Sequence, residues 1–256
     1  THGDHGKPHP YSNTQCLPIM RPKVLASCLL VSSFRGAIAM QQFLTLPNGE
    51  SLAYHRHLPP NNNNIGVLFC CGFRSSMNGN KALKLEEFCR SQLDIGFTRF
   101  DYRGHGESSC CKDFESLGMS DWMADARAVL KECSCKRVIL VGSSMGAWIA
   151  LQLALEKPER VAGILGIAAA PDFTVDVWKN MTTEQQTELI TRQRVLLPSE
   201  YSDQPYPISR HLLQDANQWL LFDKKILLED SSMPSSDSTT GTVVVQDTID
   251  IQCPVR

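Results

Sequence analysis

The residues best placed to do chemistry lie in the segment 138–148, VILVGSSMGAW. Its first four residues are apolar and mostly β-branched, as in a strand that is buried on both faces. Gly142, Ser144 and Gly146 then match Gly-x-Ser-x-Gly, in which a serine occupies a sharp turn between a strand and a helix. The same five residues also occur by chance in ordinary turns. With an apolar strand before it and an apolar helix after it, the pattern predicts Ser144 as a nucleophile.

A serine nucleophile needs hydrogen-bond donors for the negative charge that develops on the attacked carbonyl oxygen. The N–H of Met145 is one predicted donor, because it begins a helix whose N-terminus carries partial positive charge. The second is the N–H of Phe73, which follows Cys71 and Gly72 at the end of an expected strand. A glycine there lets the backbone approach a substrate carbonyl. Gly72 fits a simple turn equally well.

Alternating strands and helices are expected on both sides of this turn. In order they are strand 65–71, helix 80–91, strand 97–102, helix 120–133, strand 138–141, helix 145–155 and strand 161–170. Such alternation predicts an α/β fold with a mostly parallel, doubly wound sheet, and it places Ser144 at the carboxyl end of a central strand, where ligands bind in open sheets. A hairpin around Asn48-Gly49 is expected to precede them.

Two of the expected helices carry specific predictions about burial and capping. In the helix 80–91, the apolar stripe is expected to contain Ala82, Leu85, Phe88 and Cys89. In the helix 120–133, Ser120 is expected to be the N-cap. Its buried face is expected to contain Trp122, Ala126, Val129 and Cys133.

The region 173–228 lacks strand periodicity and mixes aromatic residues with Glu, Gln and Pro. This composition predicts short helices and turns. They would form either a cap over Ser144, whose aromatic residues make an apolar wall for an acyl chain, or a peripheral helical segment packed on the sheet. The segment 230–242, rich in Ser, Pro, Thr and Asp, predicts a mobile loop. The last residues, 249–256, are expected to begin another buried strand. The main domain is therefore expected over 41–256.

Composition narrows the class of protein. The chain has 256 residues, which suits one large α/β domain or two small domains. Its residues are 42% hydrophobic and 20% charged, with a formal net charge of -2, and this argues against nucleic-acid binding. No apolar run is long enough to cross a bilayer. The ten cysteines include the adjacent pairs Cys70-Cys71 and Cys110-Cys111, which suits buried free thiols in a reducing compartment. Their spacing does not suit a zinc site, and no metal or cofactor is expected.

Residues 1–39 differ from the rest of the chain. They contain four Lys or Arg residues, several serines and the single acid Asp4, a composition typical of a mitochondrial presequence. A short secretory segment at 24–31 and a disordered extension remain open alternatives. We expect a targeting segment and a mitochondrial matrix protein, with a cytoplasmic protein as the alternative.

His105 lies in a glycine-rich loop that precedes Ser144 in the chain. A histidine near a nucleophile is a possible general base. Its place in a loop between a strand and a helix favours a structural role instead.

The turn 142–146, the segment 71–73 and the loop 101–108 together resemble the α/β-hydrolase family, from about residue 41 to the end of the chain. Further segments are more discriminating and are similar to the mitochondrial acyl-protein (palmitoyl) thioesterases of that family, also described as acyl-glucuronide esterases. They are MNGNKAL at 77–83, EEFC at 86–89, RFDY at 99–102 and IQCP at 251–254. The departures are Cys71, where a proline or histidine is common, and an insertion around 230–247.

The resemblance implies a serine hydrolase that acts on an acylated protein or a small acyl ester without a cofactor. Ser144 is acylated and water then releases the acyl group. The family's catalytic triad follows the order Ser, Asp, His, and here the last strands, the final helix and both of these triad residues would lie beyond Arg256. The only histidine after Ser144 is His211, within 173–228, and it is not assigned as the base. We therefore expect impaired catalysis from this chain. A carboxylesterase of small esters or lipids and an inactive fragment that acts as an interaction module are the alternatives.

Overall fold

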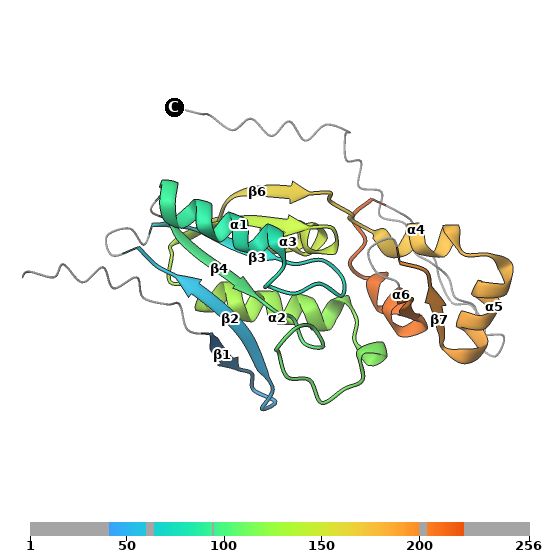
Figure 1. Cartoon of the computed structure of the whole chain (residues 1–256). Helices are drawn as coiled ribbons and strands as arrows, with labels where there is room; N and C mark the ends of the chain where they lie inside the picture. The colour runs from blue at the N-terminus through green and yellow to red at the C-terminus, as the bar shows by residue number, and fades with distance from the viewer. Residues whose placement is uncertain (1–40, 60–63, 94, 200–203, 223–256) are drawn as a thin grey trace, which may run out of the picture. The chain divides into compact units, whose positions relative to one another are not determined.

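A computed structural model of the chain describes residues 41–59, 64–93, 95–199 and 204–222 (Figure 1). The predictions for 1–39, 230–242 and 249–256 lie outside these residues. The described part contains a sheet of six strands in the order β1-β2-β4-β3-β5-β6. These strands are β1 (Gln42–Thr45), β2 (Ser51–His57), β3 (Ile65–Cys70), β4 (Gly96–Phe100), β5 (Arg137–Ser143) and β6 (Val161–Ile167).

The sheet is mostly parallel, as the sequence predicts. The strands β3, β4, β5 and β6 run parallel, while β1 and β2 form an antiparallel hairpin. Gly49 in the hairpin turn has a φ of 86°, which glycine adopts without strain. In the centre of the sheet, Cys70 at the end of β3 pairs with Gly142 on β5. The loop after β3 and the turn after β5 therefore begin side by side.

In the described part of the chain, three helices cover the two faces of the sheet: α1 (Asn80–Phe88), α2 (Met119–Glu132) and α3 (Met145–Glu156). The side chain of Arg99 on β4 reaches Glu86 of α1, whereas the preceding residue, Thr98, is hydrogen-bonded to Cys133 at the end of α2. Neighbouring residues of a strand point to opposite faces, so α1 and α2 lie on opposite faces of the sheet (Figure 1). Because α3 contacts α2, it lies on the α2 face.

The expected buried face of α2 is confirmed, since Trp122, Ala126, Val129 and Cys133 are all buried. The expected start of this helix is wrong. It begins at Met119, and the carboxylate of Asp121 accepts the N–H of Gly118 (3.1 Å). The hydroxyl of Ser120 is not a cap because it donates to Asp215 of α6 (Arg210–Ala216) at 2.6 Å.

The predicted apolar stripe of α1 is only half right. Ala82 and Cys89 are buried, but Phe88 is 49% exposed. The buried position between Ala82 and Cys89 is occupied by Glu86. Its carboxylate pairs with the guanidinium of Arg99 at 2.6 Å. The apolar pattern missed this face because a buried ion pair takes the place of one apolar residue.

The region after β6 contains α4 (Phe173–Asn180), α5 (Thr183–Arg192), β7 (Arg194–Leu197), β8 (Tyr206–Ser209) and α6. The expectation of helices and turns without strands is wrong, because β7 and β8 form an antiparallel pair. Each is only four residues long, too short for an alternating pattern to stand out. The carboxylate of Asp172 accepts the N–H groups of Leu221 and Phe222, so the two ends of this region meet. Its role as a cap stays a prediction.

Candidate active site

Ser144 lies between β5 and α3 in a backbone conformation that side chains rarely adopt, with φ 53° and ψ −122°. Such strain persists only where the surroundings fix it. Here the N–H of Ser144 donates to the carbonyl of Ile167 (3.1 Å), and its own carbonyl accepts from Ala147 (2.9 Å) and Ala170 (3.3 Å). The turn 142–146, called the elbow below, therefore has the geometry that the sequence motif predicts.

Two glycines make this elbow possible. A Cβ atom on Gly142 would collide with the backbone of Ala147, and one on Gly146 would collide with the carbonyl oxygens of Cys70 and Cys71. The first contact lets α3 turn back onto β5, and the second lets α3 pack against the end of β3. Both are contacts with backbone, which cannot rotate out of the way as a side chain can.

The residues 72–75, called the oxyanion loop below, lie against the elbow. A Cβ atom on Gly72 would stand 3.2 Å from the carbonyl oxygen of Ser143 and 3.4 Å from the Cβ atom of Ser144. Met145 is the first residue of α3, so its N–H has no partner within the helix. In the described part of the chain, the N–H of Phe73 likewise donates to no backbone carbonyl. Both donors are available beside Ser144, and their role in holding an oxyanion stays a prediction.

Aromatic rings surround the side chain of Phe73. Its ring centroid lies 5.5 to 6.0 Å from those of Phe114, Trp122, Phe173 and Tyr206. Phe173 comes from α4 and Tyr206 from β8. The region after β6 therefore reaches the oxyanion loop and makes one side of it apolar.

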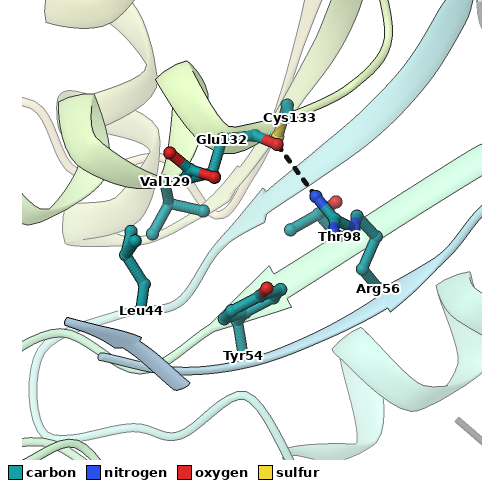
Figure 2. A pocket seen from close by; sticks show the side chains of 7 residues that line it. All are labelled: Leu44, Tyr54, Arg56, Thr98, Val129, Glu132 and Cys133. Atoms are coloured by element: carbon teal, nitrogen blue, oxygen red, sulfur yellow. Dashed lines mark hydrogen bonds between the residues drawn. The ribbon is translucent and has the colours of Figure 1, made fainter. Parts of the chain in front are cut away.

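A cavity of about 200 Å³ adjoins the elbow and the oxyanion loop. Gly72, Ser143 and Lys81 of α1 are among the residues that line it, and the ammonium of Lys81 donates to the hydroxyl of Ser143 (3.1 Å). A second hollow, shown in Figure 2, is not a ligand site. It leaves no room for a water molecule, and two of the residues that line it are bonded to each other: the guanidinium of Arg56 donates to the carbonyl of Glu132 (2.8 Å).

No base contacts Ser144 within the described residues, where its hydroxyl has no hydrogen-bond partner. His211 is exposed at the start of α6. His105 has both ring nitrogens engaged: Nε2 accepts the N–H of Arg74 and Nδ1 donates to the carbonyl of Arg103, each at 3.1 Å. The geometry of His105 agrees with the structural role inferred from the sequence.

Sequence patterns missed two buried carboxylates near this site. Asp101 accepts the N–H of Met77 (2.6 Å) and of Glu107 (3.0 Å), which joins the loops after β3 and β4. Asp172 closes the region after β6, as described above. A buried carboxylate needs donors, but which backbone N–H groups provide them depends on loops that are distant in sequence. The only sequence signal was the position of each Asp at the end of an expected strand.

The described residues contain neither a metal-binding cluster nor a membrane-spanning helix. Among the described residues, no three His, Cys, Asp or Glu side chains cluster as a metal site would require. All seven cysteines in that part of the chain are free thiols. None of the described helices has the length and apolar character to cross a membrane.

Burial lowers the pKa of the His105 imidazole from 6.5 to about 4, and the nearby positive charge of Arg74 acts in the same direction. Above pH 6.5 the ring is neutral in both the folded and the unfolded chain. As the pH falls from 6.5 to 4, the unfolded chain binds a proton that the folded chain does not, so the free energy of unfolding decreases. The expected loss from this group is about 3 kcal/mol.

Urea unfolding of the wild type and of His105→Gln between pH 7 and pH 4 measures this loss. The carboxylates titrate in both proteins, so the difference between the two curves isolates the imidazole. We expect the wild type to lose stability more steeply. Parallel curves would contradict the assignment.

The sequence of this chain is similar to those of known hydrolases. The model of the family described as serine aminopeptidase, S33, matches residues 67–217. The rat protein named palmitoyl-protein thioesterase ABHD10, mitochondrial, is 37% identical over 164 residues, which cover 64% of this chain and 53% of that protein. The human protein of the same name is 31% identical over 211 residues, which cover 82% of this chain and 65% of that protein. The chain thus spans between half and two thirds of the length of these curated relatives.

Two solved structures are similar to this chain over most of its length. The mouse α/β hydrolase domain-containing protein 10 has a TM-score of 0.62 and 33% identity, covering 72% of this chain and 71% of that one. A hydrolase described as putative, from Agrobacterium vitis, has a TM-score of 0.65 and 32% identity, covering 71% of this chain and 72% of that one. Because the family match spans more than half of the chain and includes the elbow, this chain belongs to the α/β-hydrolase family of serine hydrolases and esterases.

Proposed function

We propose that the protein hydrolyses acyl thioesters or esters through an acyl-enzyme on Ser144. The observation that carries the proposal is the strained backbone of Ser144 between β5 and α3, held by its neighbours and faced by the oxyanion loop. A serine is kept in such a conformation where its hydroxyl must be presented above a sheet. The family to which the chain belongs uses a serine in this way.

In the proposed mechanism the oxygen of Ser144 attacks the acyl carbonyl carbon. The N–H groups of Phe73 and Met145 bind the resulting oxyanion, and the helix N-terminus at Met145 adds favourable charge. A base takes the serine proton and delivers it to the departing thiolate or alkoxide, and water then releases the acid. We assign the base to a histidine in the part of the relatives' length that this chain does not span, because no base contacts Ser144 in the described residues.

The proposed substrate class is a palmitoylated or otherwise acylated protein. Three observations support it: the name of the rat and human relatives, the 31% to 37% identity to them, and the aromatic residues around Phe73, which suit an apolar acyl chain. Small carboxylic esters and acyl glucuronides are further substrates that the same mechanism accommodates. For location we propose the mitochondrion, from the relatives' names and from the basic, acid-poor residues 1–39.

Covalent labelling with a fluorophosphonate probe tests the nucleophile. In a protein extended to the full length of its relatives, we expect the probe to label Ser144. The substitution Ser144→Ala should abolish this labelling. Ser143→Ala is the matched control, since Ser143 is the neighbouring hydroxyl and is bonded to Lys81 instead. Equal labelling of Ser144→Ala and the wild type would exclude Ser144 as the nucleophile.

A further inference from the structure

The oxyanion loop is held by two hydrogen bonds on consecutive peptide groups. Ser75 N–H donates to the carbonyl of Gly72 (3.1 Å). That carbonyl shares a peptide plane with the N–H of Phe73, and the two point in opposite directions. The next peptide N–H, that of Arg74, donates to Nε2 of His105 (3.1 Å). Because the Gly72 carbonyl points toward Ser75, the Phe73 N–H points away from Ser75. The Arg74 N–H points toward His105.

The bond to His105 holds the one residue of this loop whose backbone is strained. Arg74 has a φ of 54°, which is unfavourable for a residue with a side chain. Without His105, the Arg74 N–H would also lose its acceptor, which costs free energy. Rotation of the peptide between Phe73 and Arg74 relieves both, and it moves the turn that directs the Phe73 N–H.

His105 is itself rigidly placed. Its Nδ1–H donates to the carbonyl of Arg103, and its backbone N–H donates to the carbonyl of Tyr102 (2.9 Å). The ring is 3% exposed and lies edge-on to Tyr102, Phe114 and Trp122 at centroid distances of 5.4 to 5.5 Å. The acceptor atom Nε2 therefore has one position and, with the proton on Nδ1, one tautomer.

We propose that His105 is a positioning residue of the hydrolase, which directs the Phe73 N–H toward the oxyanion by accepting the N–H of Arg74. His105 takes no part in proton transfer, because both of its ring nitrogens are engaged by backbone groups. The inference rests on the proposed function, since it needs Ser144 to generate the oxyanion. The loop after β4, which carries His105, would then help to stabilise the transition state, a role that the elbow motif alone does not predict.

The kinetics of His105→Leu and His105→Gln, measured in a protein extended to the full length of its relatives, test the proposal. Leucine removes the acceptor, and we expect kcat to fall about 10- to 100-fold, somewhat less than when an oxyanion donor is deleted outright. KM should stay within about twofold, because the Phe73 N–H binds the substrate oxygen strongly only when negative charge develops on it. Affinity for a trifluoromethyl ketone, which binds as an oxyanion, should fall in parallel. The amide oxygen of glutamine accepts a hydrogen bond near the position of Nε2, so His105→Gln should recover most of both losses.

A merely structural role predicts a different result. In that case the folded fraction of His105→Leu would keep the wild-type kcat and the wild-type ketone affinity, and the proposal would be overturned. Fluorophosphonate labelling of the wild type separates this failure from failure of the proposed function: an unlabelled Ser144 refutes the hydrolase, whereas a labelled Ser144 with unchanged kcat refutes only the role of His105.

Nuclear magnetic resonance of the wild-type protein gives a second measurement, which does not depend on the folding of His105→Leu. The ¹⁵N shifts of the His105 ring at pH 7 should show a protonated Nδ1 and an unprotonated, hydrogen-bonded Nε2. The amide of Arg74 should exchange slowly with solvent. A proton on Nε2, or fast exchange of the Arg74 amide, would contradict the proposal.

Discussion

We expect the chain 1–256 to hydrolyse a short thioester on the order of 10⁴ to 10⁶ times more slowly than a longer protein does. The longer protein is extended at its C-terminus to include an aspartate and a histidine of the triad. A serine hydroxyl is a poor nucleophile at neutral pH unless a positioned base takes its proton. In the described residues the hydroxyl of Ser144 has no partner, and His105 has both ring nitrogens engaged. The residual rate should come from the oxyanion donors alone.

Steady-state hydrolysis by the two proteins, with the soluble fraction of each quantified, measures this difference. Ser144→Ala in the longer version provides the background rate. If both proteins are soluble and equally active, a residue within 1–256 is the base, and His211→Gln then tests the one histidine that follows Ser144. Equal rates would also mean that the proposed position of the triad is wrong.

Gly146→Ala is expected to lower the free energy of unfolding by about 4 kcal/mol or more, or to prevent folding. The added Cβ would collide with the carbonyl oxygens of Cys70 and Cys71. Cys70 ends β3 and pairs with Gly142 on β5, and the residue before it, Phe69, pairs with Arg99 on β4. The backbone therefore cannot move away without disturbing the strand pairing. A flexible side chain at this contact would relax, whereas paired backbone does not.

Gly163→Ala is the matched control. Gly163 also lies in the parallel part of the sheet, on β6, but a Cβ atom there would meet nothing within 4 Å. Its effect should stay within about 0.5 kcal/mol. Urea unfolding of the two variants and the wild type measures both values. Equal stability of the two variants would show that α3 does not pack against the end of β3 as described.

Local patterns in the sequence were enough to predict much of the fold. The apolar run before Gly142 and the apolar helix after Ser144 are contiguous, so strand, elbow and helix were all predictable from adjacent residues. The same holds for the hairpin at Asn48-Gly49 and for the buried face of α2. In each case the signal is a periodicity or a turn residue whose effect is exerted within a few positions along the chain.

The tertiary structure alone decided which polar groups are buried and what they contact. Glu86 faces inward because Arg99 arrives from β4, and Asp172 binds the N–H groups of Leu221 and Phe222 almost fifty residues later. His105 meets the oxyanion loop only because β3 and β4 are neighbours in register. Such bonds join groups that are distant in sequence, and a polar residue carries no local sign of its partner. The sequence therefore determined the nucleophile candidate and the strands around it, whereas the register of the strands decided how the loop beside it is held.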